Sequence, residues 1–421
     1  MWWTVLISVL ATLAVAFVAM NLMSGEKKIQ EQLDRLYDTH DPQFRRSMSV
    51  LLGPPLLEGN RVQELLNGDQ IFPAMLEAIH GAKRSITFET FIYWKGEIGD
   101  RFAEALAERA RLGVKVHVLL DWVGSMKMED RYLQQMKEAG VAVERYHKPH
   151  WSHLARLNQR THRKVLVIDG HLGFTGGVGI ADEWQGQAQD EDHWRDTHFR
   201  VEGPVVAQMQ AVFVDNWIKA TGCVLHGDDY FPALPPVGEQ PAQMFSSSPT
   251  GGSESMHLMY LMAITSARET IHLSSSYFVP DSLAVQALVD ARKRGVRVCL
   301  ITPGRHIDTA TVRRASRARW GPLLEAGVEI AEFQPTMFHC KVLVVDSLLV
   351  SVGSTNFDNR SFRLNDEANL NVLDAAFARR LIAVFEQDWQ RAKQVSFQAW
   401  RHRPWREKLI EHAAALLRTQ L

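Results

Sequence analysis

The sequence predicts an α/β protein of two homologous lobes, each a mostly parallel or mixed β-sheet flanked by helices, with an N-terminal transmembrane helix. Three observations lead to this prediction. Short strands rich in Val and Ile alternate with helical stretches, a pattern typical of α/β folds. The alternation occurs twice along the chain, so the fold unit is repeated. An uncharged apolar run, residues 2–20, is long enough to cross a bilayer core of about 30 Å.

The apolar run WWTVLISVLATLAVAFVAM opens the chain. A cleaved signal peptide would normally have a positive start and a shorter apolar stretch, so we expect a retained anchor over residues 1–23. Lys27 and Lys28 follow this run, and the positive-inside rule then leaves the body of the protein in the cytoplasm, with a single membrane span. Residues 24–60 are expected to form a juxtamembrane segment or helical extension.

The composition excludes several classes of protein. The 421 residues have the apolar and charged fractions of a globular protein with a large core. A formal net charge of −1 provides no global polycation, so nucleic acid is not an expected partner. The cysteines are few, odd in number and scattered, which is typical of a reducing compartment.

The repeat is clearest in two short segments. FHCKVLVVDS, residues 338–347, restates THRKVLVIDG, residues 161–170. Three polar residues keep their spacing in both: His162, Lys164 and Asp169 in the first, and His339, Lys341 and Asp346 in the second. Upstream segments also match in pairs: 85–94 with 270–279, 113–121 with 295–303, and 138–146 with 325–333. The sequence therefore contains one fold unit twice.

A stretch rich in Pro, Ser and Gly, residues 231–253, separates the two units and is expected to be a linker or crossover. We therefore predict a first lobe over 61–240 and a second over 241–395. Residues 396–421 would form a C-terminal tail helix. Its mixture of Trp with Arg and Lys fits either a membrane surface or an ordinary terminal helix packed on the body.

The repeated motif suggests chemistry on an anion. Alternation along a strand puts His162 and Lys164 on one side, and likewise His339 and Lys341. A protonated lysine has no lone pair for a metal, so no metal is expected. We expect no other cofactor either. Two such pairs would hold a phosphate between the lysines, with one imidazole attacking phosphorus and the other protonating the leaving oxygen.

Carboxylates near the motifs have two expected roles. Asp196 and Glu367 follow the two motifs and are candidates to orient the histidines. Asp169 and Asp346 belong to the catalytic motifs, but their odd offset places them on the other side of the strand. We expect them to order the hairpin turn.

The paired motifs, followed by GSTNFDNRSF at 353–362, resemble the phospholipase D superfamily. Together with RTHRKVLVIDG, WRDTHFRVEGPVV and FHCKVLVVD, they are similar more narrowly to bacterial cardiolipin synthases of the phospholipase D type. The resemblance implies two phospholipase D-like lobes with one active site at their interface. It also implies a phosphatidyl-histidine intermediate and transfer of the phosphatidyl group to phosphatidylglycerol, from a second phosphatidylglycerol or from phosphatidylethanolamine.

The resemblance extends to individual residues. It makes His162 the nucleophile and His339 the general acid and then base, and it assigns phosphate binding to Asn356 and Ser354. The family usually has an asparagine after each glycine pair, but here the corresponding first-lobe residue is Gly179.

Alternatives remain open at this stage. A hydrolytic phospholipase D, or a phosphodiesterase or nuclease of the same superfamily, could use the same motifs, whereas a catalytically dead scaffold would not need them. The spacing of His147, His150 and His153 could suggest a metal, but Pro149 and the absence of acidic or Cys ligands favour a loop beside the site. Oligomeric state is not indicated.

Overall fold

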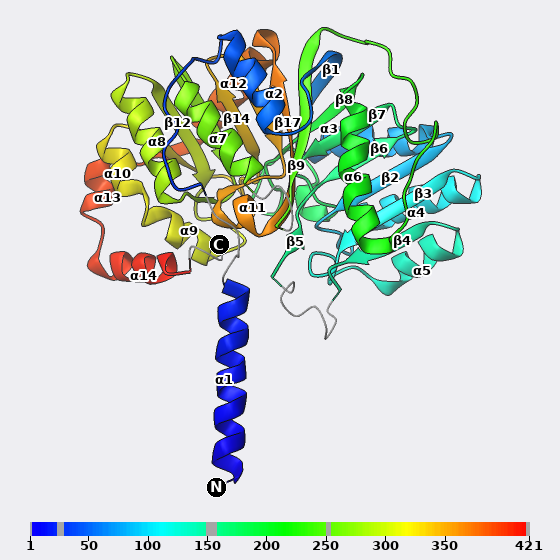
Figure 1. The fold of residues 1–421 in the computed structure, drawn as a ribbon, viewed down its shortest axis with the longest axis horizontal. Helices are drawn as coiled ribbons and strands as arrows, with labels where there is room; N and C mark the ends of the chain where they lie inside the picture. Colours follow the sequence, from blue (N-terminus) through cyan, green and yellow to red (C-terminus); the bar gives the residue numbers. More distant parts are fainter. Residues whose placement is uncertain (1, 23–28, 149–157, 250–253, 418–421) are drawn as a thin grey trace.

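The structure is a computed structural model that describes residues 2–22, 29–148, 158–249 and 254–417, with side chains in the first of these ranges described through Phe17. Two α/β units lie side by side and share one mixed sheet of sixteen strands (Figure 1). The predicted α/β fold, with a mixed sheet flanked by helices, is confirmed. We call β1 to α6 the first half and β9 to α12 the second half.

The strands repeat in order between the halves. Those of the first half are β1 (Leu57–Leu66), β2 (Ser85–Thr90), β3 (Lys115–Asp121), β4 (Ala142–Tyr146), β5 (Arg160–Thr161), β6 (Val165–Ile168), β7 (Leu172–Gly176) and β8 (Thr197–Glu202). Those that follow are β9 (Gln240–Ser247), β10 (Thr270–Ser275), β11 (Phe278–Val279), β12 (Arg297–Pro303), β13 (Glu329–Phe333), β14 (Lys341–Val345), β15 (Leu349–Gly353), β16 (Phe357–Asp358), β17 (Asn365–Leu373) and β18 (Ala392–Gln394).

The sheet order is symmetric about the junction of the halves. From that junction the first half runs β1, β8, β7, β6, β2, β3, β4, and the second runs β9, β17, β15, β14, β10, β12, β13, with β18 at its outer edge. β2, β3 and β4 are parallel neighbours, as are β10, β12 and β13, because helices connect them. The upstream sequence matches therefore correspond to equivalent strands.

β9 corrects one expectation. It lies inside the stretch 231–253 that the sequence indicates as linker, yet it pairs with both β1 and β17 at the centre of the sheet. Ala242, Met244 and Phe245 are buried, so this segment packs as a core strand despite its Ser and Pro content. The halves are consequently joined by backbone hydrogen bonds rather than by a free linker.

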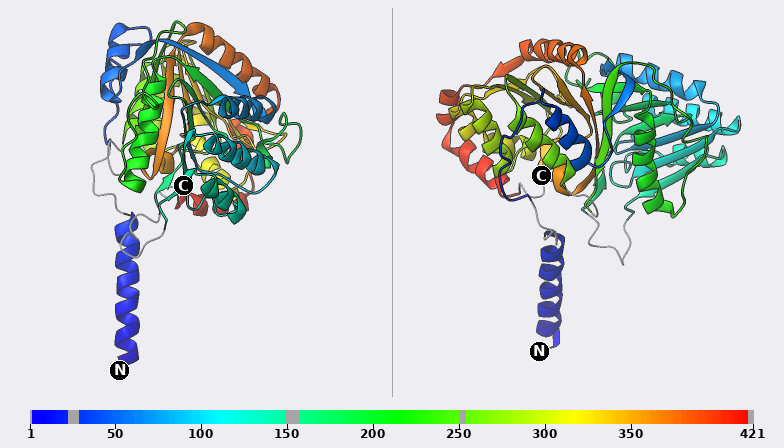
Figure 2. Two further views of the ribbon diagram at one scale, coloured as in Figure 1. Left: turned by 90° about the vertical axis from the view of Figure 1, so that its right-hand side faces the viewer. Right: turned by 45° about the horizontal axis from the view of Figure 1, so that its top comes forward.

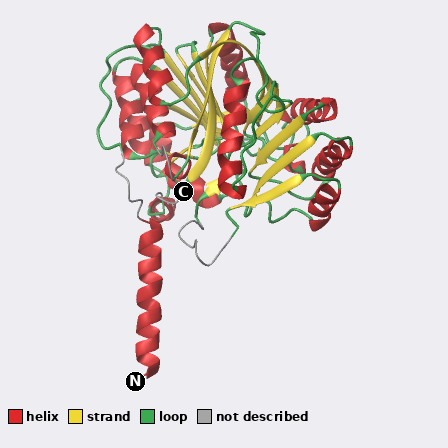
Figure 3. Ribbon diagram, turned by 45° about the vertical axis from the view of Figure 1, so that its right-hand side comes forward, coloured by secondary structure: helices red, strands yellow, loops and turns green. Residues whose placement is uncertain are grey.

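Helices cover the sheet on both faces (Figure 3). In the first half they are α3 (Asn67–Gly81), α4 (Glu97–Arg111), α5 (Asp130–Glu138) and α6 (Val206–Thr221), with a 3-10 turn η2 (Asp182–Trp184). In the second half they are α7 (Ser255–Ser266), α8 (Ser282–Lys293), α9 (Ala310–Arg317), α10 (Trp320–Glu325), α11 (Asn359–Arg363) and α12 (Ala375–Gln390). One core cluster belongs to each half, and a third is shared, with α6 and α12 packed on strands from both halves.

Two helices precede the first half. α1 (Trp2–Leu22) projects away from the body (Figures 1 and 2), and its described side chains are largely exposed. Judged on the described residues alone, no helix reaches the length and apolarity needed to cross a membrane. Residues 29–41 form no helix, contrary to the expected helical extension, and α2 (Pro42–Leu51) buries Phe44 and Met48 in the second-half core.

The C-terminal residues form α13 (Phe397–Arg401) and α14 (Trp405–Ala415) rather than one continuous helix. Pro404 precedes α14 and has no N–H for a helical hydrogen bond, which explains the break. α14 packs against α9 and buries only Glu411 and Ala414. The lobe limits of 61–240 and 241–395 stay a prediction.

Candidate active site

The two histidine motifs lie at equivalent points of the two halves. His162 and Lys164 immediately precede β6, and Lys341 begins β14, two residues after His339. All four side chains are buried. Backbone contacts cross between the halves at each motif, because His162 N–H donates to the Asp366 carbonyl at 2.9 Å and His339 N–H donates to the Arg195 carbonyl at 2.7 Å.

Each histidine is held by a carboxylate from the other half. His162 Nδ1 lies 3.0 Å from Glu367 Oε1, and His339 Nδ1 lies 2.8 Å from Asp196 Oδ2. The sequence suggested an orienting carboxylate after each motif, but the structure pairs them crosswise. A carboxylate on Nδ1 fixes the tautomer with the proton on that nitrogen, so Nε2 keeps its lone pair for chemistry.

The lysines complete the site. Lys164 Nζ donates to the His162 carbonyl at 2.7 Å, and Lys341 Nζ donates to the His339 carbonyl at 2.8 Å and to Ser276 Oγ at 2.6 Å. The charge of Lys341 acts on His162, and that of Lys164 acts on His339. The four side chains therefore form one electrostatic unit at the junction of the halves.

Burial keeps both imidazoles neutral at pH 7. Desolvation, reinforced by Lys164 and Lys341, places the pKa of His162 well below its ordinary value. Desolvation and Lys341 lower the pKa of His339 to about 4, although Asp196 opposes them. A neutral imidazole is the nucleophilic form, so the free site is ready to attack phosphorus.

Burial and neighbouring charges also shift the pKa values of the carboxylates and lysines of the site. Burial opposes ionisation of Asp196, but His339, Lys341 and the backbone N–H of Thr197 hold its pKa below the ordinary value. Burial raises the pKa of Glu367, and the Lys164 charge only partly offsets this. Burial and then Lys341 lower the pKa of Lys164. Two cations in so small a space are relieved when an anion binds between them, which suits a phosphodiester.

Aromatic side chains make the two histidines unequal. His339 lies beside the contacting pair Trp184 and Trp194, with ring centroids 5.2 and 5.7 Å away, and Trp184 Nε1 donates to Asp196 Oδ2 at 2.9 Å. His162 instead contacts Phe91 in an edge-to-face arrangement, with the two ring centroids 5.2 Å apart. Sequence reasoning did not single out these rings or Ser276. Trp194 is the first residue of the quoted segment WRDTHFRVEGPVV, whereas Phe91 is indicated only by its place in the repeated segment 85–94.

The two glycine-pair segments also differ. Asn356 is buried, and its Oδ1 has no hydrogen-bond partner among the described residues. At Gly179, a Cβ would lie 2.6 Å from Ile92 Cβ and 3.3 Å from a Trp184 ring carbon, so the first half has no room for a side chain there. Ser354 directs its hydroxyl to Glu367 Oε2, which orders the carboxylate that holds His162.

Asp169 and Asp346 lie at the far end of the motif strands, roughly 16 Å of extended chain beyond each lysine. Both adopt left-handed turns, with φ of 52° and 53°. Asp169 accepts backbone N–H groups of residues 83–85, and Asp346 does the same for residues 268–270. The two carboxylates therefore fasten the hairpin to the start of β2 or β10 and do not reach the histidines.

Asp169→Ala is expected to destabilise the fold by about 3 kcal/mol, because three backbone donors lose their acceptor. Activity per folded molecule should be retained, since the carboxylate lies away from the histidines. Thermal unfolding and assays at low temperature would measure both. The exposed Asp228→Ala is the matched control, and an Asp169→Ala protein that is stable but inactive would place this carboxylate in the chemistry.

Among the described residues, no group of three or more His, Cys, Asp or Glu side chains could hold a metal ion. His147 lies in a turn beside Gln159, with Nδ1 3.1 Å from that carbonyl. His150 and His153 fall outside the described residues.

Comparison with known proteins gives the family. A family model described as cardiolipin synthase, phospholipase D-like domain, matches residues 75–217 and 260–389, which is most of both halves. The chain belongs to this family. The resemblance seen in the sequence is confirmed, and the two matched ranges agree with the internal repeat.

Individual relatives agree with the family. The chain is 35% identical over 366 residues to a cardiolipin synthase of Geobacillus kaustophilus, covering 86% of this chain and 73% of the relative. It is 37% identical over 360 residues to cardiolipin synthase A of Pseudomonas fluorescens, covering 83% and 73%. The structure of phosphatidylserine synthase from Haemophilus influenzae superposes with a TM-score of 0.67 over 90% of this chain and all of that one. At 13% identity, that likeness shows the fold alone.

Proposed function

We propose that this protein is a phosphatidyltransferase that makes cardiolipin from phosphatidylglycerol and a second phospholipid. Membership of the cardiolipin synthase family supports the substrate class. The observation that carries the chemistry is the paired site, in which two neutral imidazoles, each oriented by a carboxylate, flank two lysines. The donor is phosphatidylglycerol or phosphatidylethanolamine.

The first step forms a covalent intermediate. Nε2 of His162 attacks phosphorus of the donor, and the bond from phosphorus to the headgroup oxygen breaks. Lys164 and Lys341 stabilise the charge of the pentacoordinate transition state. The bound phosphodiester anion raises the pKa of His339, so this imidazole holds the proton that it gives to the leaving alcohol. A phosphatidyl group is then bonded to His162.

The second step reverses these roles. A free hydroxyl of phosphatidylglycerol attacks phosphorus, and His339 takes its proton. The bond between phosphorus and His162 breaks, and cardiolipin leaves. Glu367 stabilises the imidazolium character of His162 while the intermediate exists, as expected for a carboxylate 3.0 Å from Nδ1. Asn356 and the backbone beside it are proposed to contact the phosphate oxygens, with Ser354 acting through Glu367.

Product analysis tests the proposal. Purified full-length protein in detergent is supplied with phosphatidylglycerol, with and without phosphatidylethanolamine, and the lipids are identified by mass spectrometry. We expect cardiolipin with glycerol or with ethanolamine, and the second product identifies the donor. Phosphatidic acid alone would replace the proposal by a hydrolytic phospholipase D.

We also propose that α1 anchors the chain in a bacterial inner membrane, with the body in the cytoplasm. α1 has no charged residue over its 21 residues and presents exposed side chains such as Trp3 and Leu13. At about 1.5 Å per residue its length approximates the apolar thickness of a bilayer. Protease added to intact spheroplasts should spare the body, whereas digestion of the body would overturn this topology.

A further inference from the structure

Exposed apolar side chains gather at the C-terminus. Large hydrophobic residues with high exposure occur mainly on α1, and elsewhere most are single or paired. α14 and the turn after it are the exception, with five in a short segment: Trp405 68%, Leu409 63%, Ile410 48%, Leu416 83% and Leu417 53% exposed. A concentration of this kind on a soluble surface marks an interaction site.

The orientation of α14 is fixed from its other side. Arg403 Nε donates to Glu411 Oε2 at 2.7 Å, and Arg317 Nε donates to Glu411 Oε1 at 2.8 Å. These pairs are largely buried, and Ala414 packs beside them. The helix is thus attached to α9 through Glu411 and Ala414, and its exposed apolar side chains form a face that is left to solvent.

Basic residues border this apolar face. Arg401 and Arg406 are exposed and Lys408 is half-buried, whereas Glu411 is already neutralised by two arginines. The remaining acidic residue of the helix, Glu407, lies 4.0 Å from Arg317. Exposed Trp and Leu bordered by Arg and Lys are the features of a helix that lies in the interface of an anionic membrane.

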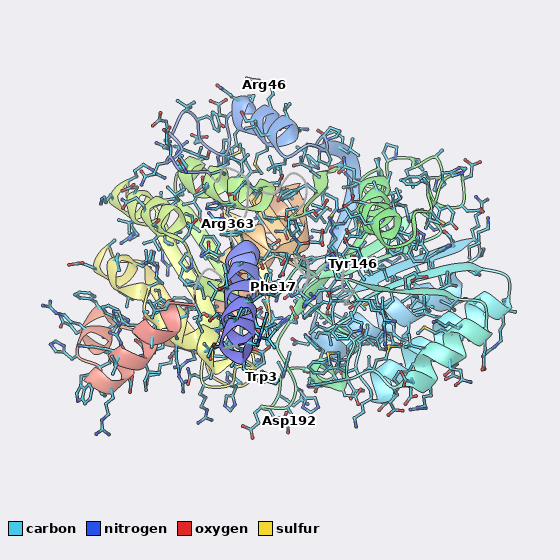
Figure 4. The ribbon with its side chains drawn as sticks, turned by 60° about the horizontal axis from the view of Figure 1, so that its bottom comes forward. Trp3, Phe17, Arg46, Tyr146, Asp192 and Arg363 are labelled. Atoms are coloured by element: carbon cyan, nitrogen blue, oxygen red, sulfur yellow. The ribbon has the colours of Figure 1, made fainter. Side chains whose placement is uncertain are left out.

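The position of α14 agrees with that partner. α14 lies on the side of the body from which α1 projects (Figure 1), and Figure 4 shows both from that side. We propose that the α14 face docks on the interface of an anionic bilayer and forms a second contact beside the α1 anchor. One anchor alone leaves the body free to rotate about it, whereas two contacts fix the face that the active site presents to lipid. The proposal does not require the reaction to be cardiolipin synthesis.

Site-directed spin labelling tests the docking. The full chain carrying Cys223→Ser, which removes the exposed native thiol, is labelled at Leu409→Cys and placed in lipid nanodiscs. The matched control is Val50→Cys on α2, which is 76% exposed and lies on the opposite side of the body (Figure 1). Collisions of the label with oxygen, which concentrates in lipid, are compared with collisions with a water-soluble nickel complex.

In discs containing phosphatidylglycerol, the label at position 409 should favour oxygen, and the label at position 50 should favour nickel. In phosphatidylcholine discs the preference of the label at position 409 for oxygen should be smaller. Equal aqueous exposure at both positions would overturn the docking, and shielding of 409 from both reagents would indicate a protein partner instead. No turnover is measured, so failure here is distinct from failure of the proposed reaction.

A second inference concerns ion pairs behind the histidines. Arg195, whose carbonyl holds His339, donates from Nε and Nη2 to Asp388 of α12 at 2.9 and 2.8 Å. Asp366, whose carbonyl holds His162, lies 3.8 Å from Lys219 of α6 and 3.9 Å from Arg163. Lys219 also donates to Asp215 at 2.8 Å. α6 and α12 are equivalent helices, so the two pairs occupy equivalent places with their charges exchanged. Each pair links one half to the other.

We infer that these pairs are positioning devices, Arg195–Asp388 for His339 and Lys219–Asp366 for His162. Arg195 and Asp196 are adjacent, so the bidentate pair fixes the backbone that supplies both the carbonyl and the carboxylate contacts of His339. The Lys219 contact is longer and partly exposed, and a smaller effect is expected there. This inference rests on the proposed histidine roles.

A substrate with a good leaving group separates these roles. p-Nitrophenolate leaves without protonation, so a phosphatidyl p-nitrophenyl ester needs His162 but not the acid His339 to form the intermediate. In single-turnover assays Asp388→Asn should slow the reaction with phosphatidylglycerol and leave the rate of p-nitrophenol release unchanged. Asp388→Glu should restore the rate with phosphatidylglycerol. Lys219→Met should slow both substrates by the same factor.

Equal losses on both substrates in Asp388→Asn would show a merely structural role and overturn the inference. If the two variants exchange their patterns, the positioning stands and the histidine roles are reversed. Arg297→Met, which removes a distant Arg–Glu pair with a 2.9 Å contact to Glu329, is the control and should change neither rate. Absence of p-nitrophenol release from the unaltered protein would instead count against the proposed function.

Discussion

His162→Ala is expected to lower kcat for cardiolipin formation by about 10⁴-fold or more, because the proposed first step bonds phosphorus to His162 Nε2. Initial rates with phosphatidylglycerol in detergent would measure this. His162 carries no charge at pH 7, and Glu367 keeps its contact with the Ser354 hydroxyl when the imidazole is removed, so thermal unfolding should show a modest change. The exposed His226→Ala is the control, with both rate and stability retained.

A His162→Ala protein with substantial activity would mean that the acceptor attacks the donor directly. The two-step account would then fail, although the site could still bind phosphate through its lysines.

Asp196→Asn is expected to lower kcat by roughly 10²–10⁴-fold through His339, although the two residues come from different halves. The neutral amide accepts the hydrogen bond from Nδ1–H less strongly than the carboxylate does and can also donate to Nδ1. The tautomer and orientation of the imidazole are therefore no longer fixed. Glu367→Gln should act in the same way through His162. Rates of single and double variants measured with phosphatidylglycerol would reveal which residues act together.

The crossed pairing gives a specific pattern of non-additivity. Adding Asp196→Asn to His339→Ala should cost little more than His339→Ala alone, because the carboxylate no longer has its imidazole to orient. Adding Glu367→Gln to the same His339→Ala protein should lower kcat by the full factor that Glu367→Gln causes alone. The opposite pattern would mean that each carboxylate serves the histidine of its own half.

Much of the fold follows from the sequence because its signals are local or repeated. Val- and Ile-rich strands that alternate with helical stretches, together with the matched segments, predict two α/β units with equivalent hairpins. β9 was not predicted, because its Ser-rich sequence becomes a core strand only when strands of both halves flank it. Pairing at the centre of a sheet is a tertiary effect that composition does not reveal.

The candidate site was predictable where residues repeat and not where they differ. His162 and His339 are indicated by identical spacing, and Asp196 and Glu367 by following each motif. The crosswise pairing depends on how the halves face each other. Trp184 and Ser276 have no equivalent of the same type in the other half, so the repeat cannot point to them; only the assembled structure brings them to Asp196 and Lys341.

Trapping the intermediate tests the central claim most directly. His339→Ala protein is treated with a phosphatidyl p-nitrophenyl ester, so the intermediate forms without the acid but lacks the base that activates the acceptor. After a rapid quench, peptide mass spectrometry should find the phosphatidyl group on His162, in an amount close to the p-nitrophenol released. An adduct on His339 in the converse His162→Ala protein, or turnover with no adduct in either, would contradict the account.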